Sequence, residues 1–163
     1  LLLSRAEPDA QSGANRTRTD LYDLAFDTAR NWVPNAMAAG IDLGFDENSD
    51  HVQAEIDAAL VAEALNNLLD NALKYCPPQA RVTVSVRKLP GPTVVVEDTG
   101  PGIPVAERSR VVQRFYRGDH ASEGGTGLGL AIANEIALAH SGRFVIGDSA
   151  GGGARFEIHL PGV

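Results

Sequence analysis

Two asparagines, Asn67 and Asn71, stand one helical turn apart in the leucine-rich stretch NNLLDNALKY, residues 66–75. Asparagine is a poor helix former, and glutamate, lysine or glutamine would suit an exposed helix face better. Lys74 continues the same stripe, and Tyr75 follows it. An amide oxygen is a neutral, hard ligand that suits Mg²⁺, and a lysine one turn further on can meet a phosphate. Taken alone, such a stripe more often indicates a solvated helix face.

A second group of residues lies in EDTGPGIP, residues 97–104, where a strand is expected to end on Asp98. A carboxylate at a strand end can accept a hydrogen bond from an exocyclic amine, which would select adenine. Gly100 and Gly102 permit positive φ or the close approach of a flat ligand. A simple strand-end turn is the alternative, because aspartate is common in turns. The density of glycine and proline favours a turn shaped for a ligand.

A third group is the glycine-rich segment GGTGLGLAIANEI, which starts at Gly124 and leads into a helix. The unpaired amides of a helix's first turn form an anion site. A dinucleotide fingerprint would need a strand directly before the glycines, and HASE is not one; the P-loop pattern is absent. Upstream, Arg114 and Arg117 would reach a terminal phosphate if this loop covers the ligand, although surface arginines without a ligand are the alternative. For His120 we favour that alternative.

The elements that must position these groups follow from periodicity and from helix breakers. Residues 7–19 are polar and turn-rich, which predicts a linker. Helices are expected from Asp20 to Gly40, disturbed at Pro34, and from a cap at Asp57 to Tyr75, before the prolines at 77–78. Further helices are expected at 105–115 and 128–140, the last closed by Gly142, and strands at 41–45, 81–86, 93–98, 143–147 and 154–160. This order predicts an α+β fold, a two-layer sandwich with helices on one face of a mixed sheet.

Composition sets limits on the function. The chain has 163 residues, enough for one compact domain with a sizeable core. Its net charge of −7 argues against a nucleic-acid-binding surface, although it does not exclude a nucleotide whose phosphates a cation neutralises. The single cysteine, Cys76, rules out an internal disulfide and fits a reducing compartment. No apolar run approaches the length needed to span a bilayer.

In this fixed order, the three groups resemble the N, G1, F and G2 boxes of the ATP-binding catalytic domain of bacterial sensor histidine kinases. That domain belongs to the GHKL superfamily, shared with gyrase, the Hsp90 chaperones and the MutL repair proteins. The resemblance covers residues 20–163. It implies the α/β sandwich of the Bergerat fold, with ATP and Mg²⁺ held between the helices under a glycine-rich lid.

The resemblance also implies roles for individual residues. Asn71 would be the Mg²⁺ ligand, with Asn67 near the phosphates; Lys74 would contact phosphate, and Tyr75 would lie against the nucleotide. Asp98 would read the adenine amine. The remaining positions that correspond to family motifs are the pocket residues Gly100, Gly102 and Ile103, the lid anchor Phe115, the γ-phosphate contact Arg117, and the phosphate-binding loop Gly125, Thr126, Gly127, Leu128 and Gly129. Catalysis would consist of positioning by Asn67, Asn71, Lys74 and Arg117.

Two departures refine the implied activity. In gyrase-like ATPases the position of Asn67 resembles a glutamate that activates water, and an amide is a poor general base. This favours transfer of the γ-phosphoryl to another acceptor over hydrolysis. None of the four histidines, 51, 120, 140 and 159, has the phosphoacceptor context. We expect His140 to interact favourably with a helix dipole and His159 to be structural. Cys76, where the family often has threonine, is interpreted as a small neutral replacement.

We therefore interpret residues 1–19 as the end of a preceding dimerisation hairpin plus linker, and residues 20–163 as the catalytic ATP-binding domain. The expected partners are the dimerisation and histidine-phosphotransfer domain of the same kinase and a cognate response regulator. We expect no nucleic acid, no membrane contact and a monomeric chain, the cytoplasmic part of a sensor anchored in the inner membrane. The alternatives are a serine kinase or ATPase of the same fold, or a non-catalytic nucleotide-sensing interaction module.

Overall fold

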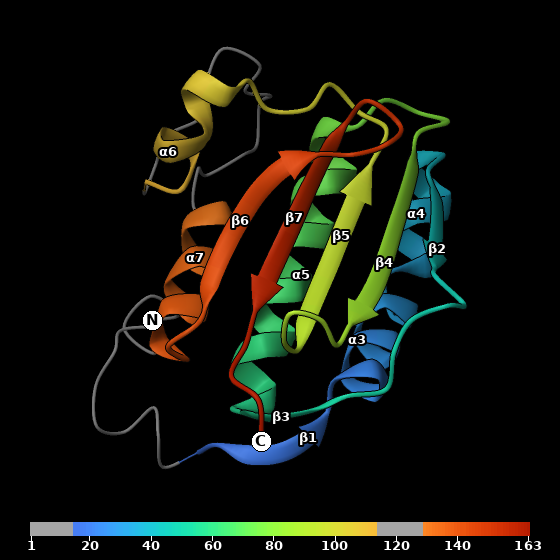
Figure 1. Cartoon of the computed structure of the whole chain (residues 1–163). Helices are drawn as coiled ribbons and strands as arrows, with labels where there is room; N and C mark the ends of the chain where they lie inside the picture. The colour runs from blue at the N-terminus through green and yellow to red at the C-terminus, as the bar shows by residue number, and fades with distance from the viewer. Residues whose placement is uncertain (1–14, 114–128) are drawn as a thin grey trace.

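The structure of the protein is a computed structural model that describes residues 15–113 and 129–163. It has two layers, a five-stranded sheet and a set of helices packed on one of its faces (Figure 1). The strands are β2 (Asp42–Phe45), β4 (Arg81–Arg87), β5 (Thr93–Asp98), β6 (Arg143–Asp148) and β7 (Ala154–His159). Their order is β2–β4–β5–β7–β6, with β2 parallel to β4 and the other neighbours antiparallel. The predicted α+β sandwich with a mixed sheet is therefore confirmed.

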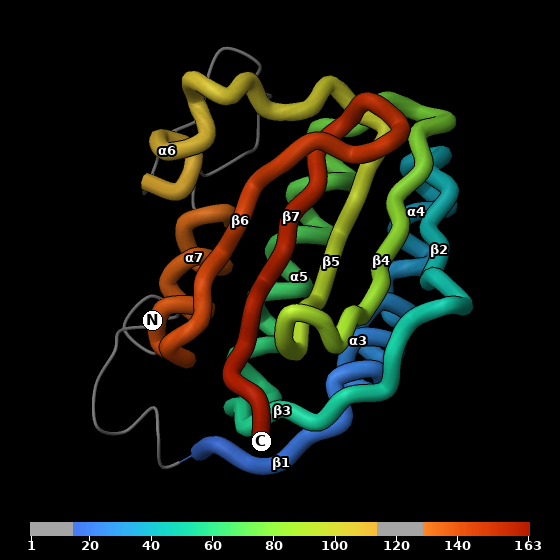
Figure 2. The backbone as a smooth tube through the Cα atoms, in the orientation of Figure 1, coloured from blue at the N-terminus to red at the C-terminus, as the bar shows by residue number. Residues whose placement is uncertain are grey.

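The helical layer contains α3 (Leu21–Arg30), α4 (Val33–Ala39), α5 (Ala58–Tyr75) and α7 (Gly129–Ala139). The backbone trace places α5 in the middle, with α3 and α7 on either side of it (Figure 2). The cap predicted at Asp57 is confirmed, because its carboxylate accepts the Leu60 amide at 3.2 Å. Pro34 lies in the first turn of α4, where it has no amide to lose, so it separates α3 from α4 as predicted.

The core lies between α5 and the sheet. On the sheet side it is built from alternate valines of β4 and β5, such as Val84 and Val96, both with no exposed surface. On the helix side a stripe that includes Leu65, Leu68 and Leu69 is at most 1% exposed. Burying one such side chain contributes about 1.5–3 kcal/mol. This stripe fixes the rotation of α5, and so determines where its polar face points.

The opposite face of the sheet is polar. Arg155 of β7 bonds Glu157 at 2.8 Å and Glu97 at 3.1 Å. The imidazole of His159 lies 2.7 Å from Glu157 and 3.2 Å from the Thr93 hydroxyl. His159 is therefore a part of the sheet surface, as predicted.

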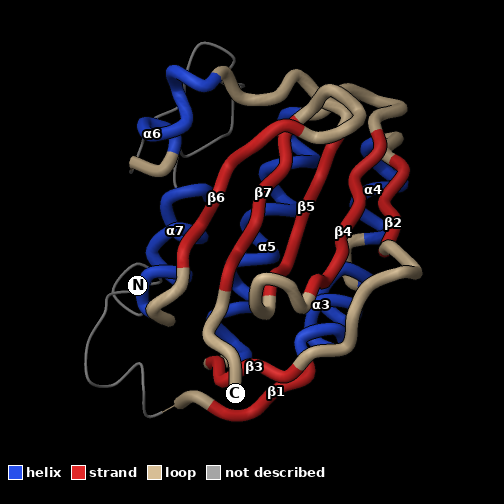
Figure 3. The backbone as a smooth tube through the Cα atoms, viewed as in Figure 1, coloured by secondary structure: helices blue, strands red, loops and turns tan. Residues whose placement is uncertain are grey.

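Two strands were not predicted. β1 (Thr17–Asp20) and β3 (Gln53–Ile56) pair antiparallel as a separate ribbon at one end of the layers (Figure 3). Residues 17–19, which the sequence analysis placed in a linker, are thus a strand. Their amides and carbonyls find partners in a segment more than thirty residues away, so no local pattern marks them.

Two predicted helix ends also differ. In place of one helix over 105–115, the described residues form a 3₁₀ turn (Val105–Glu107) and the short helix α6 (Arg108–Val111). α7 ends at Ala139, and the left-handed residue after it is Ser141, at φ 60°. A Cβ at Gly142 would lie 1.8 Å from the His159 carbonyl oxygen. The glycine is therefore required by a close approach of the backbone to β7. Within residues 15–113 and 129–163, no helix has both the length and the apolar character to cross a bilayer.

Candidate nucleotide-binding site

Asp98 lies at the end of β5 in a backbone cage. Its side chain is nearly enclosed, and the residue is 6% exposed. One carboxylate oxygen, Oδ1, accepts the amides of Gly100 at 2.9 Å and Ala154 at 3.1 Å. A Cβ at Gly153 would lie 2.2 Å from the Asp98 carbonyl oxygen and 2.4 Å from Oδ1, so only glycine fits beside it. Main-chain amides from the loop after β5 and from the start of β7 therefore fix the position of Oδ1.

The C-terminal end of α5 meets the same cage through Cys76. A Cβ at Gly100 would lie 2.7 Å from the Cys76 Sγ and 3.3 Å from Asp98 Oδ1. Burial, the negative charge of Asp98 and a hydrogen bond to its carboxylate raise the pKa of the Cys76 thiol to about 12. The prediction of a neutral side chain here is confirmed. Gly102 has φ 73°, the left-handed conformation that glycine adopts at little cost.

The start of α7 lies on α5 at Asn67. The Asn67 Nδ2 donates to the Glu63 carbonyl at 2.8 Å, a bond to its own helix that offsets part of asparagine's low propensity. A Cβ at Gly129 would lie 3.6 Å from the Asn67 carbonyl oxygen and 4.0 Å from its Oδ1. The first residue of α7 thus lies against the face of α5 that carries Asn67. Asn71, half-buried, follows one turn later, and its side chain makes no hydrogen bond to any other described residue.

Lys74 and Tyr75 complete the stripe at the end of α5. The Lys74 ammonium pairs with Asp70 at 3.0 Å, and both side chains are more than 40% exposed. A surface pair at this spacing is worth only about 0.3–0.5 kcal/mol, so a stronger anion could displace Asp70. Tyr75 is half-buried.

Ile103 belongs to the loop after β5 and is half-buried. Its carbonyl accepts Arg108 Nε at 3.0 Å, and Arg108 also pairs with Asp148 at 2.7 Å. This arginine, which the sequence analysis did not single out, ties the loop to the end of β6. The other predicted positions lie outside the described residues: Phe115, Arg117, Gly125, Thr126, Gly127 and Leu128. Among the described residues, the start of α7 thus meets α5 at Asn67, and the end of α5 meets Asp98 and Gly100 through Cys76. The structure adds Gly153 and Ala154, whose only sequence signal is the glycine run at 151–153.

His140 joins α7 to the first turn of α5. It is 1% exposed; its Nδ1 donates to the Ile136 carbonyl at 2.8 Å, and its Nε2 accepts the Asp57 amide at 3.0 Å. An Nε2 that accepts a hydrogen bond carries no proton, and burial lowers the pKa of this imidazole. The predicted charge–dipole role is therefore wrong. The cation at this helix end is Arg16, whose Nη2 donates to the Ala139 carbonyl at 2.5 Å.

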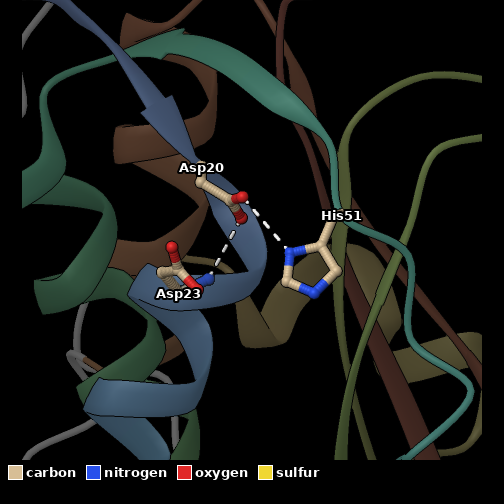
Figure 4. A group of neighbouring side chains, drawn as sticks. All are labelled: Asp20, Asp23 and His51. Atoms are coloured by element: carbon tan, nitrogen blue, oxygen red, sulfur yellow. Dashed lines mark hydrogen bonds and ion pairs between the residues drawn. The ribbon is translucent and has the colours of Figure 1, made fainter.

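A separate group of polar side chains, Asp20, Asp23 and His51, lies at the β1 end of the molecule, opposite the C-terminal end of β5 (Figures 1 and 4). Asp20 caps α3 by accepting the Asp23 amide at 3.2 Å, and its second oxygen pairs with His51 Nδ1, also at 3.2 Å. Tyr22 stacks on the His51 ring at 3.9 Å. Capping and stacking account for this group, so we assign it no cation.

Residues 56–163 match the family described as histidine kinase-, DNA gyrase B- and HSP90-like ATPase, and the chain belongs to that family. It is thus a nucleotide-binding domain of the GHKL class. Within the class it is similar to sensor histidine kinases. It is 44% identical over 128 residues to the histidine-protein kinase/phosphatase MprB of Mycobacterium sp. strain KMS, covering 74% of this chain and 25% of that protein.

A second relative is the sensor histidine kinase RppB of Synechocystis sp., 34% identical over 165 residues, covering 99% of this chain and 36% of RppB. Among solved structures, the mycobacterial sensor histidine kinase MprB matches with a TM-score of 0.77 and 33% identity, over 90% of this chain and 98% of that one. The predicted class, the ATP-binding catalytic domain of sensor histidine kinases, is confirmed. The chain spans about a quarter to a third of the length of these two curated relatives.

Proposed function

We propose that this chain binds ATP with Mg²⁺ and, in the intact protein, donates the γ-phosphoryl to a histidine on a separate dimerisation domain. The observation that carries the proposal is the carboxylate of Asp98, which main-chain groups hold next to the C-terminal end of α5, the helix that carries Asn67 and Asn71. Oδ1 is occupied by two amides, so further lone pairs of the carboxylate can accept from the exocyclic amine of adenine. Guanine carries a carbonyl at that position and would be repelled.

The polyphosphate would extend from Asp98 along α5 toward the start of α7. Asn71 is the proposed Mg²⁺ ligand, because its side chain is not engaged by other described residues and an amide oxygen suits this ion. Lys74 would exchange its weak pair with Asp70 for a phosphate. Arg117 and the loop from Gly125 to Gly129 are proposed to cover the phosphates, with Tyr75, Gly102 and Ile103 beside the base.

Asn67 favours transfer over hydrolysis. Its Nδ2 is held by the Glu63 carbonyl, and its Oδ1, which bonds none of the described residues, is an amide oxygen that cannot take a proton from water at neutral pH. An ATP held without a base is set for attack by an external nucleophile, here a neutral imidazole. The chain's own contribution is positioning and charge neutralisation.

The whole protein would act as a two-component sensor; its relatives are named a signal transduction histidine-protein kinase/phosphatase and a sensor histidine kinase. We propose that its partners are its own dimerisation and phosphoacceptor domain and a cognate response regulator. We further propose that this chain is monomeric, and is the cytoplasmic part of a membrane-anchored sensor.

The test is calorimetric titration of ATP and ADP into the chain, with and without Mg²⁺. Asp98→Ala removes a charged acceptor, so we expect ATP affinity to fall by roughly tenfold to a hundredfold. Asn71→Ala should remove most of the Mg²⁺ dependence. Asp27→Ala and Asn35→Ala make the same changes at exposed positions and should bind as the wild type does.

Two outcomes separate the proposal from its rivals. Transfer of ³²P from ATP to a supplied phosphoacceptor-hairpin domain, with label stable to base and labile to acid, supports a histidine kinase. Wild-type chain that binds ATP but releases phosphate to water faster than it labels the hairpin would indicate the ATPase alternative. Absence of nucleotide binding would sink the proposal.

A further inference from the structure

The thiol of Cys76 is buried against Asp98, and nothing in the phosphate-binding scheme uses it. Cys76 ends α5 with extended backbone, φ −83° and ψ 140°, and is 9% exposed. Its amide is bonded to the Ala72 carbonyl at 2.9 Å, which anchors the residue to the helix. The side chain therefore leaves α5 in a fixed direction, toward the loop that follows β5.

That direction ends at the carboxylate cage. A single point, the site of a Cβ at Gly100, is 2.7 Å from the Cys76 Sγ and 3.3 Å from Asp98 Oδ1. The thiol thus lies beside the Asp98 carboxylate, and burial together with that negative charge keeps it protonated. The hydrogen bonds that Asp98 accepts from described residues come from the amides of Gly100 and Ala154, and Cys76 brings a side-chain donor next to the carboxylate.

We propose that Cys76 is a positioning residue for adenine recognition: its S–H donates to Asp98 and directs the carboxylate's remaining lone pair toward the nucleotide's exocyclic amine. The inference rests on the proposed function. The two amides hold Oδ1 but leave the carboxylate free to rock about that oxygen. A third donor, on a different element, removes that freedom. It also couples the base-reading group to α5, the helix of Asn71 and Lys74.

The test compares side chains of one shape that differ only in the donor. Threonine and valine are near-isosteric, both suit the extended backbone at position 76, and only threonine can donate. ATP and inosine triphosphate form the matched ligand pair, because inosine has a carbonyl where adenine has the amine. Calorimetry gives the ratio of the two dissociation constants for the wild type, Cys76→Thr and Cys76→Val. Thermal unfolding without nucleotide checks that each variant folds.

We expect the wild type and Cys76→Thr to prefer ATP over inosine triphosphate by ratios within about twofold of each other. A hydrogen bond to a charged acceptor changes an equilibrium constant by about tenfold or more, and because a thiol is a weak donor we expect the lower end of this range. The preference of Cys76→Val for ATP over inosine triphosphate should therefore be about tenfold smaller than that of the wild type. The loss should fall on ATP alone. If valine does not fold, Cys76→Ser and Cys76→Ala form the same donor and non-donor comparison.

A non-donating variant that keeps the wild-type preference would overturn the inference. So would an equal loss of affinity for both triphosphates, because damage to packing does not distinguish the amine from the carbonyl. In both cases the wild type still binds ATP, so the proposed function stands. If the wild type itself shows no preference for ATP, adenine reading by Asp98 fails, and this inference fails with it.

Discussion

Acidification should destabilise this domain in part through His140. The folded protein needs a neutral imidazole there, because Nδ1 donates to Ile136 and Nε2 accepts from Asp57. A proton on Nε2 would face the Asp57 N–H, donor against donor. Burial is the largest cause of the lowered pKa, and the nearby charge of Arg16 acts in the same direction; the Ile136 hydrogen bond and Asp57 oppose them.

The sign and size follow from linkage. The unfolded histidine binds its proton at about pH 6.5, and the folded one only at lower pH. The contribution is therefore fully present above pH 6.5 and is lost as the pH falls from 6.5 toward the folded pKa. The slope approaches about 1.4 kcal/mol per pH unit, so the loss by pH 5.5 is at most about 1.4 kcal/mol.

Urea unfolding at pH 7.5, 6.5 and 5.5, for the wild type and His140→Gln, measures this contribution. Glutamine is neutral throughout, so subtracting its profile removes the titration of the other histidines and of the carboxylates. At pH 7.5 the variant should be less stable by about 1–3 kcal/mol, because the buried Asp57 amide loses the acceptor that His140 Nε2 provides. The gap should narrow by pH 5.5. If the difference in unfolding free energy between the wild type and His140→Gln stays constant across this pH range, the assignment of a neutral His140 whose protonation is linked to unfolding is refuted.

Two further substitutions test the site. Gly153→Ala should cost about 3 kcal/mol or more in urea unfolding and remove ATP binding, because its Cβ would enter the Asp98 cage; Gly44→Ala, with nothing within 4 Å, should stay within about 0.5 kcal/mol. Equal effects at the two glycines would contradict the cage. Lys74→Ala should change stability by less than about 0.5 kcal/mol but weaken ATP binding roughly tenfold by calorimetry, whereas the exposed Lys88→Ala should do neither. Unchanged ATP affinity in Lys74→Ala would remove this lysine from the site.

Local chemistry made α5 predictable. An aspartate cap at 57, a leucine stripe at helical spacing and a proline two residues after Tyr75 all act within one or two turns. The same holds for β4, whose valines occupy alternate buried positions, and for β5, which carries a run of three buried valines. These elements, and the polar stripe that α5 carries, were fixed by neighbours in the sequence.

What the sequence could not supply were partners brought together by the sheet. The cage around Asp98 needs Ala154, 56 residues away, and it exists because β5 pairs with β7. His140 was misjudged for the same reason, since its decisive partner, the Asp57 amide, is 83 residues away. The β1–β3 ribbon is a third case. In each, the residue type suggested a local role and the tertiary contact determined the actual one.

The position of α5 in the chain has a consequence for how this domain opens. The helix lies in the connection between two strands that pair in parallel, β2 and β4, and it is buried against the middle of the sheet (Figure 2). Its amides should exchange hydrogen only when the whole domain unfolds. The loop after β5, which carries Gly100, lies outside the helices and strands and should exchange through small, frequent openings. The part of the adenine site on α5 thus opens only when the domain unfolds. The part on the loop after β5 can open and release a ligand while the domain stays folded.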